Sequence, residues 1–287
     1  MISRLRDAQV TIVGLGLMGS SLAGALRGRC HAVVGVTRRH ETVDVALARN
    51  LIDWGTTDMA EGVRAADVVV LATPVRVILR QLAEIGELLR EGCLLMDVGS
   101  TKAQITAEMA RLPDHVQPLG GHPMCGKEVS GVEAADPALY QGRTFILAPL
   151  ARTSEAALAL GCELAETIGA RPLVLEPERQ DYLVATVSHL PYLLACALVA
   201  TADVSTSADP AAWEIVAGGF RDTSRVAGSD VTMMLDILMT NQAKVLGALE
   251  VFQGQLGELA RQIEVADEDA LRTKLNGIRA ERLRMFP

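Results

Sequence analysis

The strongest constraint on the fold of this chain is a glycine pattern close to its N-terminus. Residues 10–26, VTIVGLGLMGSSLAGAL, run from a β-branched apolar stretch into a helical pattern, with Gly14, Gly16 and Gly19 at the junction. In such a unit the first glycine permits a tight turn, the second lets backbone approach a pyrophosphate, and the third lets the helix lie close to the strand. The helix N-terminus adds free N–H groups and a positive dipole end. The pattern therefore predicts a dinucleotide-binding site.

The chain around this motif alternates strands and helices up to about residue 176. Apolar runs predict strands at 8–14, 31–36, 66–73, 93–99, 143–149 and 171–176, and helices at 18–29, 41–50, 75–90, 101–111 and 153–168. This alternation is typical of a parallel sheet covered by crossover helices. We expect an α/β fold, with an N-terminal doubly wound Rossmann-type sheet over 1–176 and an all-helical second domain over 177–287.

The expected second domain is unusually apolar for a helical layer. Apolar residues recur at helical spacing, for example from Met234 to Leu256. We expect most of them to belong to a core, but an array this apolar needs a further surface to bury it. We therefore expect a homodimer formed through this domain.

Composition and charge exclude several classes of protein. The formal net charge of −8 argues against a nucleic-acid partner. The five cysteines are widely spaced without a CxxC pair, so we expect reduced thiols. Segment 182–200 approaches the length of a membrane span, but its Ser188, His189 and Pro191 favour a buried helix, with no membrane partner. The N-terminus lacks the pattern of a signal peptide, so we expect a cytoplasmic protein.

Further cofactor contacts are expected where the other strands end. The second strand ends in Thr37, Arg38 and Arg39 instead of the acidic residue that binds the ribose of NAD, so NADP is preferred over NAD, unless the arginines are simply solvated. The remaining predicted contacts come from the glycine loop and from the segment LATPV (71–75): Leu17, Met18, Thr73 and Pro74.

Three polar residues stand out as candidates for chemistry. His122 follows a Gly-Gly pair, expected to be a turn, and His189 interrupts an apolar helix. A buried imidazole needs a partner, so a single such histidine usually belongs to the core; two in one dehydrogenase-like chain favour function. Ser100, in DVGSTK (97–102), either faces the nicotinamide or substrate or caps the helix that follows.

A polar cluster in the helical part, GGFRDTSRVAGSD (218–230), offers a carboxylate site. The guanidinium of Arg225 is suited to bidentate binding of a carboxylate. An internal Arg-Asp pair is the alternative, and it fits Arg221 better than Arg225.

Six motifs in order give the chain a clear resemblance: VGLGLMGSSLA, VLATPV, DVGSTK, GGHPMCGKEVSGVEAA, VSHLPYLLACAL and GFRDTSRVAGSD. Together they resemble the prephenate and arogenate dehydrogenases of tyrosine biosynthesis over about residues 10–260. The last motif looks especially like the short, cyanobacterial-type arogenate dehydrogenases. The regulatory ACT domain and the fused chorismate mutase of other members are not expected.

The resemblance implies a reaction and assigns roles. Prephenate or arogenate gives a hydride from ring C4 to NAD(P)+ and loses CO2, without a metal. By similarity, His122 is the catalytic histidine, which draws off the C4 hydroxyl proton as a neutral imidazole. His189 matches a second active-site histidine, Ser100 a serine near the hydroxyl, and Arg225 the arginine that binds a substrate carboxylate.

The chain departs from the family pattern at several positions. Lys127 stands where threonine often follows HPMxG, and it is a candidate for contact with a substrate carboxylate or the cofactor phosphates. Gln180 precedes Asp181 where many members have a His-Asp pair, and Met234 replaces the tryptophan of some prephenate-using relatives. Asp181 either pairs with the ammonium of arogenate or acts as a helix N-terminal acid.

Two other functions fit parts of the pattern. A β-hydroxyacid dehydrogenase shares the domain plan and uses a catalytic lysine, for which Lys244 is the candidate. A non-catalytic NADP-binding sensor would keep the glycine loop and use the helices for protein contacts.

Overall fold

The fold is described from a computed structural model, which covers residues 4–127, 129–209 and 211–286. The chain forms two compact units, Met1–Gln242 and Ala243–Pro287. The first holds an eight-stranded sheet and the helices that follow it, and the second consists almost entirely of α12 (Gln242–Glu264) and α13 (Glu268–Met285).

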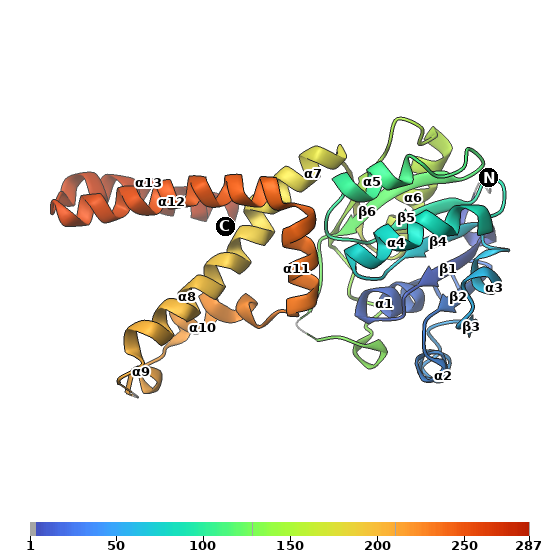
Figure 1. The fold of residues 1–287 in the computed structure, drawn as a ribbon, viewed down its shortest axis with the longest axis horizontal. Coiled ribbons are helices and arrows are strands. Elements are labelled where there is room, and N and C mark those ends of the chain that lie inside the picture. Colours follow the sequence, from blue (N-terminus) through green and yellow to red (C-terminus); the bar gives the residue numbers. More distant parts are fainter. Residues whose placement is uncertain (1–3, 128, 210, 287) are drawn as a thin grey trace. The chain divides into compact units, whose positions relative to one another are not determined.

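The sheet has the strand order β3-β2-β1-β4-β5-β6-β7-β8. Figure 1 labels its strands from β1 to β6. All neighbouring strands are parallel except β6 and β7, which are antiparallel. The strands are β1 (Gln9–Val13), β2 (Ala32–Val36), β3 (Trp54–Thr56), β4 (Val68–Leu71), β5 (Leu94–Asp97), β6 (Gln117–Pro123), β7 (Thr144–Ala148) and β8 (Arg171–Val174). The strand order reverses beside β1, so the connections that follow β1 and β4 lead in opposite directions. The crevice in which doubly wound sheets bind ligands lies between these connections, at the carboxyl ends of the two strands.

Helices cover both faces of this sheet, because successive strand residues point to opposite sides. Val68 and Val70 belong to one core cluster, which α1 (Leu17–Leu26) and α6 (Glu155–Thr167) complete. Val69 and Leu71 belong to the other, with α4 (Val75–Ile85) and α5 (Ala103–Met109). Two short helices, α2 (His40–Ala48) and α3 (Met59–Val63), pack near the β2 and β3 edge. The doubly wound fold predicted from the sequence is thereby confirmed.

Two strands were not predicted from the sequence, and one of them changes the setting of His122. β3 is short, and β6 contains a Gly-Gly pair that is typical of a turn. Gly120 and Gly121 instead pair with Ala148 and Leu147 of β7. A Cβ at Gly121 would collide with the carbonyl oxygen of Asp97, so β5 and β6 approach closely only because this residue is glycine. The expected turn before His122 is therefore wrong: the histidine lies near the carboxyl end of a buried strand.

After Val174 the described residues form no further strand, as expected for a helical second domain. A nearly continuous helix runs through α7 (Pro177–Val184), a π-helical turn at Ala185–His189 and α8 (Leu190–Thr206). By length and composition this stretch, with a mean hydropathy of 1.9 in its most apolar window, would be able to cross a membrane. Only 28% of that window is buried within the chain, so the expectation of a buried helix over 182–200 is wrong for the single chain. Short helices α9 (Ala211–Glu214) and α10 (Gly218–Ser224), the 3-10 turn Arg225–Gly228 and α11 (Val231–Thr240) complete the first unit.

Polar contacts join α11 to the sheet. The carboxylate of Asp236 accepts a hydrogen bond from the backbone N–H of Arg76, 3.1 Å away, at the start of α4. The hydroxyls of Thr240 and Thr101 lie 2.8 Å apart and are both buried. Side chains from the helical part therefore reach the edge of the sheet where the strands end, and complete the site there.

Candidate active site

The three glycines of the loop differ in why glycine is needed at each position. Gly14 has φ +104° and donates its N–H to the Val36 carbonyl at 2.8 Å, so it needs glycine for its backbone conformation. A Cβ at Gly19 would collide with the Gly14 carbonyl oxygen. Gly16, in contrast, has φ −83°, and no described atom lies within 4 Å of the position that a Cβ would occupy there. Of the three, only Gly16 could be replaced by a larger residue without a clash inside the described part of the protein. Glycine at this position therefore agrees with close approach of a phosphate to the backbone.

The N-terminus of α1 suits an anion. Its first turn contains no acidic residue, and Gly16 at the N-cap provides no side chain to occupy the free N–H groups. These groups and the helix dipole favour negative charge. Leu17 is buried in the core, and the Met18 carbonyl accepts a hydrogen bond from the Tyr140 hydroxyl at 2.7 Å, so both residues fix the start of the helix.

The other predicted cofactor contacts lie at neighbouring strand ends. Thr37 continues β2 and donates its N–H to the Thr56 carbonyl, while Arg38 and Arg39 are exposed, with Arg39 at the N-cap of α2. Thr73 directly abuts the glycine loop, since a Cβ at Gly14 would lie 2.8 Å from its methyl carbon. Pro74 forms the N-cap of α4. The residues chosen for the cofactor thus come from the ends of β1, β2 and β4, as the fold requires.

His122 sits in a buried polar cluster at the ends of β5 and β6. It is 8% exposed, and the polar side chains around it are fully buried or nearly so: Asp97, Lys102, Gln180 and His189. The amide nitrogen of Gln180 donates to the Ser100 carbonyl at 3.4 Å, which ties α7 to the loop after β5. Sequence motifs separated by more than 60 residues are therefore brought together around one imidazole.

His189 is held by the π-helical turn and by the residue that follows α11. Its Nδ1 lies 3.4 Å from the amide nitrogen of Asn241, which also donates to the Asp181 carbonyl at 2.8 Å. Because an amide nitrogen can only donate, His189 Nδ1 acts as the acceptor and the proton of the neutral ring resides on Nε2. Nε2 is buried and has no hydrogen-bond partner within the described chain, so it is available to a ligand. A π turn of this kind often occurs at a functional site.

Both histidines are held neutral. The pKa of His122 is lowered to about 3, first by burial and then by the positive charge of Lys102 and the proximity of His189. Burial lowers the pKa of His189 to about 4. A neutral imidazole is the form that can accept a proton, so His122 keeps that capacity at neutral pH. In His189 the Nδ1 lone pair is already occupied by Asn241, and the neutral ring offers its Nε2–H as a donor.

A buried ion pair underlies this cluster. The Lys102 ammonium pairs with Asp97, whose carboxylate also accepts from the backbone N–H groups of Gly99 at 2.7 Å and Gly121 at 3.1 Å. Burial raises the pKa of Asp97 and lowers that of Lys102, and their mutual attraction opposes both shifts. The pair fixes the ends of β5 and β6 and places a cation near His122.

The structure bears on two of the alternatives left open by the sequence, both at α5. Ser100 is not its N-cap: the helix begins at Ala103 and its N-cap is Lys102. The capping carboxylate is that of Asp181 from α7, which accepts from the N–H groups of Lys102 at 2.7 Å and Ala103 at 2.9 Å. Asp181 is 1% exposed, so the structure favours its role as a helix N-terminal acid over a pairing with substrate ammonium.

Lys127 and Arg225 lie outside this buried cluster. Lys127 is exposed and pairs with Asp136 at 2.9 Å, and the Asp136 N–H donates to Ser21 of α1. Arg225 is exposed at the start of a 3-10 turn that packs against α8.

Several members of the cluster were not predicted as functional residues from the sequence: Asp97, Lys102, Gln180 and Asn241. Asp97 and Lys102 lie within the DVGSTK motif. Charged residues at the end of an apolar strand could have identified them as candidates for a buried functional pair. Asn241 had no local signal, because only the tertiary fold places it beside His189.

Comparison with known proteins agrees with this geometry. Residues 22–174 match the nucleotide-binding domain of prephenate dehydrogenase, and residues 176–277 match its dimerization domain. A cyclohexadienyl dehydrogenase from Zymomonas mobilis is 34% identical over 266 residues, covering 91% of this chain and 90% of its own length.

Two solved structures share the whole fold. Prephenate dehydrogenase from Aquifex aeolicus, in complex with hydroxyphenyl propionate and NAD+, has a TM-score of 0.90 at 32% identity, covering 96% of this chain and 98% of its own. Synechocystis arogenate dehydrogenase has a TM-score of 0.85 at 30% identity, covering 96% and 99%. Together with the sheet, the glycine loop and the buried histidines, these matches show that the chain belongs to the prephenate dehydrogenase family of oxidoreductases.

Proposed function

We propose that this protein catalyses the NAD(P)+-dependent oxidative decarboxylation of prephenate, arogenate or both. The observation that carries the proposal is the buried, neutral imidazole of His122, placed where β6 ends beside the loop that bears Ser100. A base is needed there because the C4 hydroxyl of the substrate must become a phenol. Family membership favours this chemistry over that of a β-hydroxyacid dehydrogenase, for which Lys244 was the candidate.

The chemistry follows from what the site can do. His122 accepts the proton of the C4 hydroxyl, which strengthens electron donation toward C4 and assists departure of its hydrogen as hydride. The glycine loop and the ends of β2 and β4 would hold the dinucleotide, whose nicotinamide would supply the hydride acceptor. The bond from C1 to the ring carboxylate then breaks, CO2 leaves, and its electron pair completes the aromatic ring. His122 returns its proton to the oxygen, so the products are CO2, the reduced cofactor and a phenol: 4-hydroxyphenylpyruvate or tyrosine.

The other predicted side chains have supporting roles in the proposal. His189 offers the N–H of Nε2 to the substrate, and Ser100 lies close to the hydroxyl. Arg225 binds a substrate carboxylate through its guanidinium. Lys127 remains a candidate for carboxylate or phosphate contact, although its ion pair with Asp136 competes with that role.

NADP is the proposed cofactor, ahead of NAD. The support is the run Thr37, Arg38 and Arg39 at the end of β2, where exposed guanidinium groups suit a 2′-phosphate and the ribose-binding acid is missing. The glycine loop binds the pyrophosphate in either case.

A two-by-two comparison of specificity constants tests substrate and cofactor together. Prephenate and arogenate are each assayed with NAD+ and NADP+ by the absorbance of the reduced cofactor. We expect turnover of at least one substrate and a higher kcat/KM with NADP+. Replacing both Arg38 and Arg39 by Ser should reduce or invert the cofactor preference without affecting the choice of substrate. Cofactor binding without turnover of either substrate would instead support the sensor alternative.

We also propose a domain boundary at residues 176 and 177 and a homodimer formed through the helical part. The family domains meet between 174 and 176, which supports the boundary.

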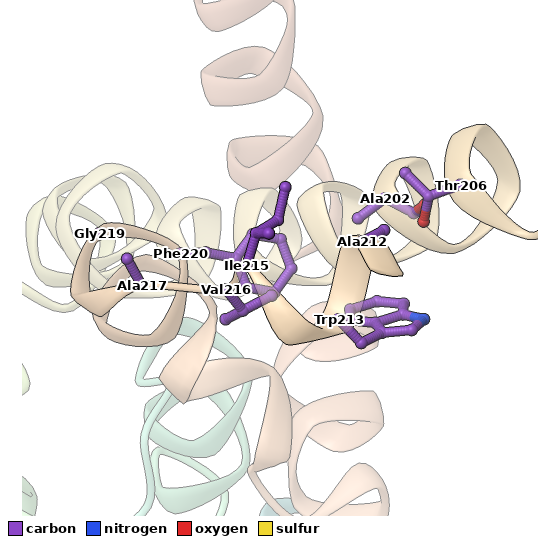
Figure 2. Close-up of a pocket in the computed structure, with 9 residues that line it drawn as sticks. All are labelled: Ala202, Thr206, Ala212, Trp213, Ile215, Val216, Ala217, Gly219 and Phe220. Carbon is purple, nitrogen blue, oxygen red and sulfur yellow. The ribbon is translucent and has the colours of Figure 1, made fainter. Parts of the chain in front are cut away.

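An apolar pocket of about 360 Å³ lies among α8, α9 and α10, where Figure 2 shows Trp213, Ile215 and Phe220 around it. Ile215 is 81% exposed and Val204 is 78% exposed, which is unfavourable in water.

A second copy of the chain is the proposed cover for this apolar surface, because it lies within the match to a dimerization domain. Sedimentation equilibrium should give twice the chain mass of 30.6 kDa, and Ile215→Asp should shift the equilibrium toward monomer. A monomeric wild type would contradict the dimer.

The proposal also includes the remaining expectations from the sequence. The substrate is a small molecule, the protein is cytoplasmic, and it has no nucleic-acid or membrane partner.

A further inference from the structure

Two polar atoms of complementary hydrogen-bonding character are buried in the active-site cluster. Nδ1 of His122 and Oε1 of Gln180 are both buried, and neither has a partner in good hydrogen-bonding geometry within the described chain. The Gln180 side chain is nevertheless close enough to act on the imidazole as a hydrogen-bonding neighbour. Leaving two such atoms unpaired is costly, so each is a natural partner for the other.

The orientation of the Gln180 amide is fixed from its other end. Its nitrogen lies 3.4 Å from the carbonyl oxygen of Ser100, which can only accept a hydrogen bond. The amide must therefore direct Nε2 toward Ser100 and leave Oε1 for the imidazole. Because Gln180 is fully buried, no bulk water competes for that oxygen.

We propose that Gln180 is a positioning residue that selects the tautomer of His122. Its Oε1 accepts a hydrogen bond from Nδ1–H of the neutral ring, which leaves the lone pair of Nε2 as the base. The arrangement corresponds to the orienting group of a catalytic triad, with an uncharged amide in place of a carboxylate. The tautomer is inferred from the two unpaired atoms and from the orientation of the Gln180 amide, and only the use of Nε2 as a base rests on the proposed function.

The uncharged amide has a consequence for the chemistry. A carboxylate at residue 180 would favour the imidazolium form of His122, whereas an amide fixes the ring while adding no charge. Burial and the titratable groups Lys102 and His189 lower the pKa of this ring, and together they outweigh the smaller increase that the Gln180 hydrogen bond contributes. The site thus orients its base and keeps it unprotonated.

The direct test is the nitrogen NMR spectrum of the full-length chain labelled with ¹⁵N-histidine. His122→Asn identifies the His122 signals by their loss. In the wild type we expect the shifts of an Nδ1–H, Nε2-lone-pair ring. Gln180→Leu should move the ring toward the Nε2–H tautomer that free histidine prefers, and Gln180→Glu should keep Nδ1–H while raising the pKa of His122.

A control variant removes a different buried amide, which lies on the same strand as His122. Gln117 lies at the start of β6, five positions before His122, and also has a buried Oε1 without a partner in the described chain. Gln117→Leu should leave the tautomer unchanged, whereas a general loss of packing would affect both variants.

Activity gives a second readout. Gln180→Leu should lower kcat by about 10- to 100-fold with KM changed much less, and Gln180→Glu should retain more activity while shifting the acid limb of the pH profile upward. A wild-type ring in the Nε2–H form, or an unchanged tautomer in Gln180→Leu, would overturn the proposal. If Gln180→Leu does not fold, an unaltered His122 pKa in Gln180→Glu would overturn it equally. Because the spectra need no substrate, these outcomes are separate from any failure of the proposed function.

Discussion

Lys102 and Asp97 form an ion pair in which neither side chain is exposed to solvent. The carboxylate closes the gap between β5 and β6 by accepting from Gly99 and Gly121, and the ammonium lies where its charge lowers the pKa of His122. One buried pair therefore contributes both to the shape of the site and to the protonation state of its base.

Removing one partner of this pair should be strongly destabilising. Lys102→Met leaves the Asp97 carboxylate buried without its counter-charge, and the free energy of unfolding should fall by about 3–5 kcal/mol. The double variant Asp97→Asn/Lys102→Met should recover part of this loss, because it leaves no charge behind. Urea titrations measure both values. Arg111→Met breaks an exposed pair with Glu108 and should cost less than about 1 kcal/mol. An equally small effect of Lys102→Met would contradict the account.

The pH dependence of activity should reflect the lowered pKa of His122. The base is lost only when the ring is protonated, and the pKa lies at about 3 instead of 6.5. The value of kcat/KM should therefore remain nearly level as the pH falls from about 8 to about 5, where an unshifted histidine would already be mostly protonated. Stopped-flow assays with brief exposure to acid keep unfolding out of the measurement. An acid limb centred near pH 6.5 would show that His122 is not held neutral in this way.

Stability should follow pH with the corresponding sign. His122 has a lower pKa in the folded state than in the unfolded state, so between about pH 6.5 and 3 the unfolded chain binds the extra proton. The contribution of His122 to the free energy of unfolding is therefore complete above pH 6.5. Below that pH it falls by up to about 1.4 kcal/mol per pH unit. Calorimetry of His122→Asn should show a flatter dependence, while His40→Asn at an exposed position keeps the wild-type slope.

The glycine loop offers a pair of substitutions that separate binding from folding. Gly16→Ala adds a methyl group where nothing in the described chain lies within 4 Å, so the melting temperature should be nearly unchanged while the KM of the cofactor rises about tenfold or more. Gly19→Ala places a methyl group against the Gly14 carbonyl and should destabilise the fold by about 1–3 kcal/mol. If Gly16→Ala bound the cofactor normally, the pyrophosphate would not approach the backbone at this residue.

Asp181→Asn should affect folding and leave substrate choice alone. An amide can offer only one oxygen to the two N–H groups of α5, so we expect a loss of about 1–3 kcal/mol in the free energy of unfolding. The ratio of KM values for prephenate and arogenate should stay within about twofold, since Asp181 is 1% exposed and each of its carboxylate oxygens already accepts from α5. A selective rise in the KM for arogenate would restore the ammonium-binding role.

The doubly wound fold and six of its strands were predictable from the sequence, because the patterns that indicate them are local. Gly14, Gly16 and Gly19 fall between a strand and a helix, and helical periodicity separates the apolar runs of the parallel strands. The Gly-Gly pair of β6 misled the prediction because glycine usually breaks a strand, whereas here it permits close packing against Asp97.

The active site was predictable only in part. His122 and His189 were identifiable as polar residues in apolar or glycine-rich settings, but their partners depend on tertiary contacts. Asp181 caps a helix about 80 residues away, and Asn241 lies beside His189 because α11 packs against α4. No spacing rule in a single sequence encodes contacts of that kind.

The central claim is that His122 is the base, and His122→Asn tests it most directly. The amide nearly preserves size and polarity but cannot accept the proton, so kcat should fall by about 10²- to 10⁴-fold. Cofactor affinity, measured by isothermal titration, should stay within about threefold of the wild type, because the glycine loop is untouched. Turnover within about tenfold of the wild type, with cofactor binding retained, would contradict the assignment of His122 as the base.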